Sequence, residues 1–315
     1  MGLRVTTTDY HTGGEPFRIV TGGVPALEGR RILDRRRFAR EHLDDVRKLL
    51  VHEPRGHADM YGCFVTEPED EGAELGVVFF HNEGYSTACG HGTIALVTWA
   101  LESGRIEAQE PETHVVVDVP SGRLDTWARI AGGDVRSVRF RNVPAFVHSP
   151  GVSFGGAFYA SVEERVEPRE LPRLIELGRR VKAELEAERE IVHPLEPELN
   201  GIYGVVFWQH EEDGPPLVQH NVTVFADGEV DRSPCGSGTS ARLALLAAER
   251  RIGAGDELVH RSIVGSEFRA RIVAETEVAG LPAVVTEVEG SAHLTGRHEF
   301  LLEPDDEIGL GFLLR

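Results

Sequence analysis

The sequence predicts a mixed α/β protein of two domains that share a repeated loop-to-helix unit. Its 315 residues exceed the length that one hydrophobic core usually supports. When the chain is laid against itself at an offset of 146 residues, a Cys-Gly-x-Gly-Thr motif followed by an apolar stretch is found twice, at Cys89 and Cys235. Short β-type runs surround both copies.

The two copies of the repeat are similar loop-to-helix units. Cys89–Ala95 reads Cys-Gly-His-Gly-Thr-Ile-Ala, and Cys235–Ala241 reads Cys-Gly-Ser-Gly-Thr-Ser-Ala. Each copy continues as an Ala/Leu-rich apolar stretch, which predicts a buried helix. Glycines commonly follow the last helical residue, so we expect the first helix to end near Gly104 and the second near Gly253.

Strands and one further helix complete the predicted elements. A run of charged residues with apolar positions at helical spacing predicts an amphipathic helix over about 168–189, whose charges form a solvated face. The clearest strand-like runs are rich in Val, Phe and Trp, and they span 76–80, 114–119, 204–208 and 221–225.

The repeat places one copy in each domain. We predict an N-terminal α/β domain over residues 1–145 that carries Cys89 and is completed by about 297–315. The C-terminal α/β domain then covers 146–296 and carries Cys235. The boundary between them rests only on the nearby Pro and Gly residues.

Composition limits the classes of partner. A formal charge of −19 disfavours nucleic acid and anionic membrane surfaces, and no apolar run is long enough to span a bilayer. The first residues lack a signal-peptide pattern and the chain has only three cysteines, which together predict a cytoplasmic protein. A homodimer is the base-rate expectation.

The repeated motif suits a particular chemistry. A cysteine before Gly-x-Gly at a helix N-terminus lies beside unpaired backbone N–H groups and the positive end of the helix dipole, which favours the thiolate. The same N–H groups suit a carboxylate. Two such loops facing each other would grip one amino-acid carboxylate and leave the Cys89 and Cys235 thiols on opposite faces of its α-carbon. Inversion of that carbon needs a base on one face and an acid on the other.

Asp231 is a candidate binding residue just before the second motif. Its carboxylate could accept hydrogen bonds from a substrate amine, although a turn or cap role in Asp231–Pro234 is the simpler alternative.

The familiar cofactor and metal signatures are weak in this chain. Pyridoxal phosphate needs a Schiff-base lysine, and the only two lysines, Lys48 and Lys182, lie on charged, apparently exposed helices. His52 and His57 are five residues apart with Pro and Gly between them, which predicts a loop with polar structural roles. No phosphate-loop or dinucleotide motif is present. We therefore expect no cofactor and no metal, and we interpret Cys63 as a buried strand residue.

The motifs resemble those of a known family. Asp231–Ala241 closely resembles the second catalytic signature of the proline racemase family, and Cys89–Ala95 resembles the first. His11–Pro16 and the final 295–296 and 304–306 segments look like family features too, so the resemblance spans the chain.

The resemblance implies a fold, an activity and a set of site residues. The implied fold is the one shared with diaminopimelate epimerase, in which two similar α/β domains clasp the substrate between their central helices. The diaminopimelate epimerases themselves carry an acidic, Gly-rich lead-in to the second cysteine in place of Asp231–Pro234, so that branch is disfavoured. The activity is cofactor-independent racemisation or 2-epimerisation of proline or hydroxyproline. By resemblance, Cys89 and Cys235 exchange the α-proton, Asp231 faces the ring nitrogen, and the carboxylate is bound by Gly90, His91, Gly236 and Ser237.

Two alternatives to the racemase stay open. The segments 52–62 and 81–87 look most similar to the trans-3-hydroxy-L-proline dehydratase branch. That branch commonly replaces one catalytic cysteine, whereas both are present here, so we favour the racemase or 2-epimerase. A non-catalytic binder of proline-like amino acids is the second alternative. It needs only the backbone donors, so the presence of both thiols argues against it.

Overall fold

The computed structural model describes residues 2–212 and 214–314, and its packing contacts divide the chain into two compact units. Unit 1 contains residues 1–87, 92–138 and 291–315, and unit 2 contains 88–91 and 139–290. The domain limits given above, residues 1–145 completed by about 297–315 and residues 146–296, stay a prediction.

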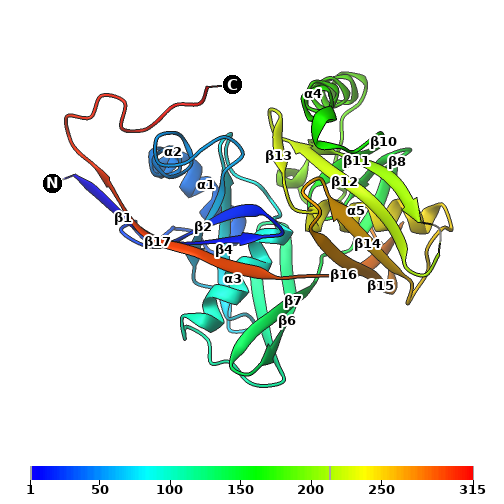
Figure 1. Cartoon of the computed structure of the whole chain (residues 1–315), viewed down its shortest axis with the longest axis horizontal. Coiled ribbons are helices and arrows are strands. Elements are labelled where there is room, and N and C mark those ends of the chain that lie inside the picture. Colours follow the sequence, from blue (N-terminus) through cyan, green and yellow to red (C-terminus); the bar gives the residue numbers. More distant parts are fainter. Residues whose placement is uncertain (1, 213, 315) are drawn as a thin grey trace. The chain divides into compact units, whose positions relative to one another are not determined.

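Unit 1 is a sheet with helices on both faces. Its strands pair in the order β17–β1–β2–β3–β4–β5–β6, parallel at β2–β3 and β4–β5 and antiparallel elsewhere. Figure 1 shows α1 and α2 on the other side of these strands from α3. The bounds are β1 Leu3–Thr12, β2 Glu15–Gly22, α1 Ile32–His42, α2 Asp44–Val51, β3 Tyr61–Thr66, β4 Leu75–His81, α3 Gly90–Glu102, β5 Glu112–Val119, β6 Gly122–Ala131 and β17 Ala292–Leu302.

Burial on both faces explains the composition of the central strands of unit 1. Every residue of β4, with the sequence Leu-Gly-Val-Val-Phe-Phe-His, is buried. Alternate residues of a strand point to opposite faces, so Val78 and Phe80 share a core cluster with Ile32 of α1 and Leu50 of α2. Phe79 points the other way. A strand covered on both faces is apolar throughout.

Unit 2 is a closed ring of strands around one helix. The ring runs β8–β9–β10–β11–β12–β14–β15–β16 and closes through the pairing of β16 with β8. Its parallel pairs are β10–β11 and β12–β14. The bounds are β7 Asp134–Arg141 (leading in from unit 1), β8 Ala145–Ser149, β9 Val152–Phe154, β10 Phe158–Glu163, β11 Ile202–Glu212, β12 Leu217–Phe225, β13 Glu229–Asp231, α5 Gly236–Ala248, β14 Glu257–Ser262, β15 Glu267–Val278 and β16 Leu281–Gly290.

The central helix of unit 2 is made of small residues for a physical reason. All side chains from Gly236 to Leu246 are buried, because α5 packs against β8, β9, β10, β15 and β16. The Gly, Ser, Thr and Ala residues of its first turns let these strands approach closely. Gly155 shows the tightness: a methyl group on it would lie 2.4 Å from the Ser237 carbonyl oxygen.

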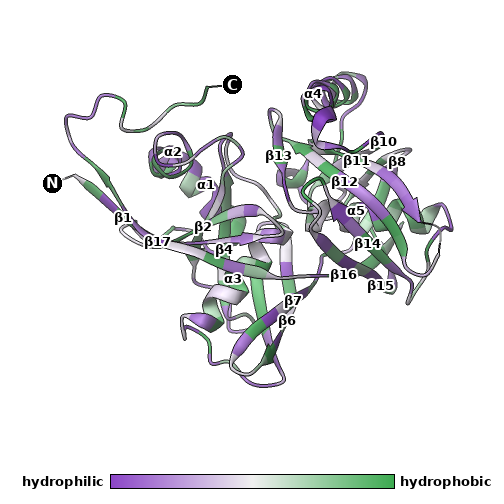
Figure 2. Cartoon of the chain, viewed as in Figure 1, coloured by the Kyte–Doolittle hydropathy of each residue, from purple (hydrophilic) through white to green (hydrophobic). Residues whose placement is uncertain are grey.

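The amphipathic helix predicted over 168–189 is confirmed. A 3₁₀ turn, Pro168–Glu170, leads into α4, Leu171–Glu188, and Figure 2 shows mixed hydrophilic and hydrophobic segments along it. Leu174 of α4 packs against Phe207 and Val224 of β11 and β12. A second 3₁₀ turn spans Pro197–Leu199. No helix in residues 2–212 and 214–314 is long and apolar enough to cross a membrane.

The ends of the two repeat helices differ from each other. α3 ends at Glu102, close to the predicted Gly104, which takes a positive φ of 71°. α5 ends at Ala248, so the prediction of an end near Gly253 was wrong by five residues. The chain turns at Arg250, which takes φ 56° without being a glycine, and its N–H donates to the Ala247 carbonyl.

Candidate active site

The approach to Cys235 is a tightly hydrogen-bonded turn at the end of β13. Asp231 Oδ1 accepts hydrogen bonds from the backbone N–H of Ser233 at 2.8 Å and from its hydroxyl at 2.7 Å. The Ser233 hydroxyl in turn accepts from the Cys235 N–H at 3.1 Å, and Asn221 Nδ2 donates to the Pro234 carbonyl. These bonds fix the position of Cys235, and one carboxylate oxygen of Asp231 therefore has the turn-stabilising role that the sequence left open.

Cys235 holds an unusual backbone conformation. As the residue preceding α5 it has φ 60° and ψ 100°, a region that non-glycine residues rarely adopt. Such a conformation costs about 1–3 kcal/mol and persists only where the surroundings enforce it. The hydrogen-bonded turn before it and the buried helix after it supply that constraint.

The Cys235 sulfur lies among hydroxyl groups. Tyr159 Oη and Ser237 Oγ are each 3.9 Å from it, and the residue is 6% exposed. Burial, followed by the negative charge of Asp231, raises the pKa of Cys235 to about 12, although hydrogen bonds from Thr223, Gly238 and Ser237 oppose the shift. At Cys235, burial therefore favours the thiol, against the preference of a helix N-terminus for the thiolate.

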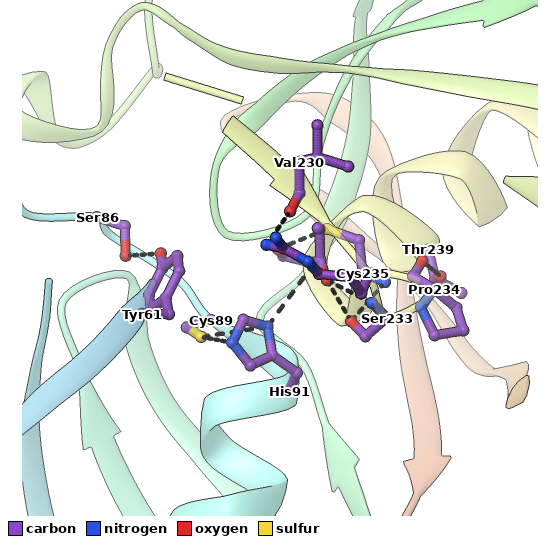
Figure 3. A network of polar contacts seen from close by, with 12 residues as sticks. Tyr61, Ser86, Cys89, His91, Val230, Ser233, Pro234, Cys235 and Thr239 are labelled. Atoms are coloured by element: carbon purple, nitrogen blue, oxygen red, sulfur yellow. Dashed lines mark hydrogen bonds and ion pairs between the residues drawn. The ribbon is translucent and has the colours of Figure 1, made fainter. Parts of the chain in front are cut away.

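Cys89 has a different neighbour. Its sulfur lies 3.4 Å from His91 Nε2 and 3.7 Å from His91 Nδ1, and the His91 ring is itself 3.7 Å from Asp231 Oδ2. Figure 3 shows Cys89 and His91 side by side, with a dashed line leading from the His91 ring toward the turn around Ser233. An imidazole in contact with a thiol can accept its proton, which is how cysteines are commonly activated.

The two Cys-Gly steps meet within unit 2. A methyl group on Gly90 would lie 2.5 Å from the Gly236 Cα atom, and one on Gly236 would lie 2.8 Å from the Gly90 Cα atom. The Phe140 ring packs against both glycines, about 3 Å from where each methyl would be. Gly90 and Gly236 are the first residues of α3 and α5, so the N-terminal ends of two helices converge at this point. Two helix N-termini together favour a bound anion such as a carboxylate.

All seven predicted site residues lie in unit 2 and all are buried. The structure brings Cys89, His91 and Asp231 into one chain of contacts, and Cys235 and Ser237 into another. The seven predicted site residues are Cys89, Gly90, His91, Asp231, Cys235, Gly236 and Ser237.

Sequence reasoning missed three neighbours of the site. Tyr159 on β10, Thr223 on β12 and Phe140 on β7 contact the motif residues, yet each lies outside both repeats. Only β-type periodicity marks these segments, and that pattern does not tell which buried side chain faces the helix.

The residues set aside from the sequence have structural surroundings. His52 and His57 lie in the turn after α2, where His52 Nε2 contacts the Asn82 carbonyl. Cys63 is fully buried in β3, and burial raises its pKa well above the ordinary range. Lys48 and Lys182 lie on α2 and α4, half-buried rather than exposed, with Lys48 bridged to Asp44 and Lys182 donating to the Ala226 carbonyl.

Residues 7–313 match the family model described as proline racemase. The chain belongs to the proline racemase family. Among curated relatives, it is 46% identical to the 3-hydroxyproline 2-epimerase of Burkholderia multivorans over 99% of this chain and 98% of that protein. It is 43% identical to the trans-3-hydroxy-L-proline dehydratase of Bacillus thuringiensis over 98% of each chain.

Solved structures give the same assignment. A hydroxyproline epimerase from Agrobacterium vitis, crystallised with trans-4-hydroxy-L-proline, superposes with a TM-score of 0.91 at 33% identity, over 99% of this chain and 96% of that one. A methylitaconate Δ-isomerase shares only the fold, with a TM-score of 0.56 at 12% identity. The predicted α/β fold of the family is therefore confirmed, and the relatives are isomerases and dehydratases that act on small molecules.

Proposed function

We propose that this protein is a cofactor-independent 2-epimerase of hydroxyproline, with Cys89 and Cys235 as its two acid/base groups. The observation that carries the proposal is the meeting of Gly90 and Gly236, because each glycine directly follows one of the two buried cysteines. A substrate carboxylate bound at the two helix N-termini would lie near both thiols, because one cysteine directly precedes each helix.

The two sulfur environments assign the starting roles. Cys235 is held as a thiol, since its pKa is raised to about 12, and it is the acid. Cys89 contacts the His91 imidazole, which can accept its proton, and it is the base. In one direction Cys89 removes the α-proton while Cys235 gives its proton to the opposite face of the α-carbon. In the reverse direction the roles exchange, so the two titrations are coupled.

Backbone N–H groups at the helix starts can stabilise the negative charge that develops during the reaction. When the α-proton leaves, negative charge spreads from the α-carbon onto the carboxylate oxygens, and N–H groups fixed at a helix N-terminus stabilise it without reorganisation. His91 and Ser237 occupy the same position in the two motifs and line this region. Asp231 Oδ2 is not used by the turn; it lies 3.7 Å from His91 Nδ1, and in the proposed complex it also faces the substrate amine.

The substrate proposal follows the relatives. The Burkholderia enzyme and the Bacillus enzyme are both named for 3-hydroxyproline, and the Agrobacterium enzyme binds trans-4-hydroxy-L-proline. We therefore place a hydroxyproline before proline itself as the substrate. We further propose a reducing, cytoplasmic location, because the mechanism needs both cysteines in the free form in which they occur here. A homodimer is proposed only as the commonest oligomeric state of soluble proteins.

Dehydration of trans-3-hydroxy-L-proline is the second candidate. It is supported by the 43% and 45% identity to dehydratases of Bacillus thuringiensis and Burkholderia ambifaria. Dehydration requires one base for the α-proton and then loses the β-hydroxyl, so it has less use for the second thiol. The presence of both thiols in one buried site favours epimerisation.

One experiment separates these reactions. The protein is incubated in D₂O with L-proline, trans-4-hydroxy-L-proline or trans-3-hydroxy-L-proline, and the products are followed by NMR and chiral chromatography. Epimerisation gives the 2-epimer with deuterium at the α-carbon, whereas dehydration gives a pyrroline product. Binding of a ligand with neither deuterium incorporation nor product would show a non-catalytic binder and overturn the proposal.

A further inference from the structure

Two hydroxyl oxygens and one sulfur atom form a small polar triangle at the start of α5. Tyr159 Oη is 2.7 Å from Ser237 Oγ, and each of these atoms is 3.9 Å from the Cys235 sulfur. Tyr159 comes from β10, far from the motif in sequence, and its side chain is almost completely buried at 1% exposure. A buried hydroxyl needs hydrogen-bond partners, and here the partners are the two motif residues.

The hydrogen-bond directions around the triangle are constrained by the number of protons. In the thiol state Cys235 donates its S–H to Tyr159 Oη, which leaves the phenol proton for Ser237 Oγ. Once Cys235 has given its proton to the substrate α-carbon, the S–H bond is broken, a C–H bond is formed, and the electron pair stays on sulfur. The thiolate is then an acceptor with no proton of its own, and the phenol O–H, which lies as close to the sulfur as the Ser237 hydroxyl, can turn to it.

We propose that Tyr159 is a positioning residue for Cys235. Its hydroxyl accepts a hydrogen bond from the Cys235 thiol before proton transfer to the substrate and donates a hydrogen bond to the thiolate afterwards. The proposal rests on the proposed two-thiol reaction and extends it to a residue outside the motifs. Tyr159 itself stays protonated throughout, because burial, the nearby Cys235 and Tyr203 raise its pKa well above the ordinary range. Cys89 has an imidazole in the corresponding place, so Tyr159 supports only one of the two thiols.

The test uses Tyr159→Phe, which removes the hydroxyl and keeps the ring that packs edge-on against Tyr203 at 5.8 Å. The free enzyme is treated briefly with iodoacetamide at one mildly alkaline pH, and the alkylated fractions of Cys235 and Cys89 are measured by peptide mass spectrometry. Because alkylation follows the thiolate, the Cys235-to-Cys89 ratio should fall about tenfold or more when a hydrogen bond to a charged sulfur is lost. Tyr203→Phe removes the same atom from the neighbouring ring and should leave the ratio unchanged.

Turnover provides the second measurement. Tyr159→Phe should lower kcat more than it raises KM, because the lost contacts are made to Cys235 and Ser237 and not to the substrate itself. The alkylation ratio needs no substrate, so it tests Tyr159 even if the epimerase proposal fails, and absence of turnover in the unaltered protein would count against that proposal alone. An unchanged or higher Cys235-to-Cys89 ratio in folded Tyr159→Phe would overturn the role of Tyr159.

A second form of the protein guards against misfolding of the variant. If the melting curve shows that Tyr159→Phe is unfolded, the alkylation test uses a different protein. That protein is the Tyr203→Phe variant, produced in cells supplied with 3-fluorotyrosine so that Tyr159 carries a fluorinated ring. Fluorine makes the phenol a stronger donor, so the Cys235-to-Cys89 alkylation ratio should rise above that of Tyr203→Phe with ordinary tyrosine. An unchanged ratio there would also reject the proposal.

Discussion

The two copies of the Cys-Gly-x-Gly motif differ most at the third position. His91 stands there in the first copy and Ser237 in the second. The first cysteine therefore contacts an imidazole, and the second lies among the hydroxyls of Ser237 and Tyr159. The two copies share the position of the helix start, because α3 begins at Gly90 and α5 begins at Gly236.

The two thiols therefore lie in different surroundings. Burial, followed by the negative charge of Asp231, raises the pKa of Cys235 to about 12, and the Ser237 hydroxyl at the third position opposes that shift. Cys89 instead contacts the His91 imidazole, a group that can accept a thiol proton. In the two-thiol reaction that we propose, this difference makes Cys235 the acid and Cys89 the base.

The largest expected effect is loss of either thiol. Cys89→Ala and Cys235→Ala should each reduce epimerisation by about 10²–10⁴-fold, the range for removal of a general acid or base. The double variant should lose little more than the worse single one, because the two thiols act as a unit. Chiral chromatography of the hydroxyproline product measures all three variants.

The same variants distinguish the second candidate reaction. If the activity is dehydration, Cys89→Ala should abolish pyrroline formation from trans-3-hydroxy-L-proline, and Cys235→Ala should retain it. Near-normal inversion by either single variant, with an unchanged circular dichroism spectrum, would exclude the two-thiol mechanism.

The next effect concerns the glycine contact that the copies share. Gly236→Ala places a methyl group 2.8 Å from the Gly90 Cα atom and 2.9 Å from the Phe140 ring, so the two helix starts must separate. We expect stability to fall by about 1–3 kcal/mol, as for other overpacked sites, and activity to fall much more than stability. Gly253→Ala, where the nearest atom is 3.6 Å away, is the control. A fully active, destabilised Gly236→Ala would show that the contact is only structural.

Exchange of the third position tests the comparison directly. His91→Ser gives the first copy the serine of the second and removes the group that can accept the Cys89 proton. Alkylation of Cys89 by iodoacetamide should slow by about tenfold, while that of Cys235 should change less. Peptide mass spectrometry reads both sites in one sample. Unchanged Cys89 alkylation would mean that the helix start alone sets its reactivity.

Much of this arrangement could be predicted from the repeat, and the exceptions have a common cause. The offset of 146 residues located both cysteines, both buried helices and the start of each helix. Closure of the strand ring through β16 and β8, and the placement of Tyr159 beside Ser237, depend on pairing between distant segments. The local hydrophobic pattern does not predict which distant segments pair.

Asp231 illustrates a residue whose two roles could not be separated from sequence. The motif suggested either a turn residue or a ligand for the substrate amine, and the structure gives one oxygen to Ser233 and directs the other toward His91. The early end of α5 could not be read from the glycine pattern either, because the chain turns at Arg250, which takes a positive φ without being a glycine.

The smallest expected effect follows from the charge of Asp231. Asp231→Asn keeps an oxygen that can accept from Ser233 but removes the negative charge that raises the pKa of Cys235. The Cys235 pKa should therefore fall from its value of about 12, and alkylation of Cys235 at a fixed pH below 12 should become a few-fold faster.

The substrate side of the same variant is measured separately. KM for hydroxyproline should rise in Asp231→Asn while the melting temperature changes little, because the lost partner is the substrate amine. An unchanged KM with a large drop in melting temperature would assign Asp231 to the turn alone.

The backbone angle of Cys235 sets stability and activity against each other at one position. A φ of 60° combined with a ψ of 100° is unfavourable for a residue with a side chain, and glycine adopts it more freely. A library of replacements at Cys235 that is selected only for resistance to heat would therefore enrich glycine and lose the thiol. Engineering for robustness has to act elsewhere in the chain and leave this strained residue in place.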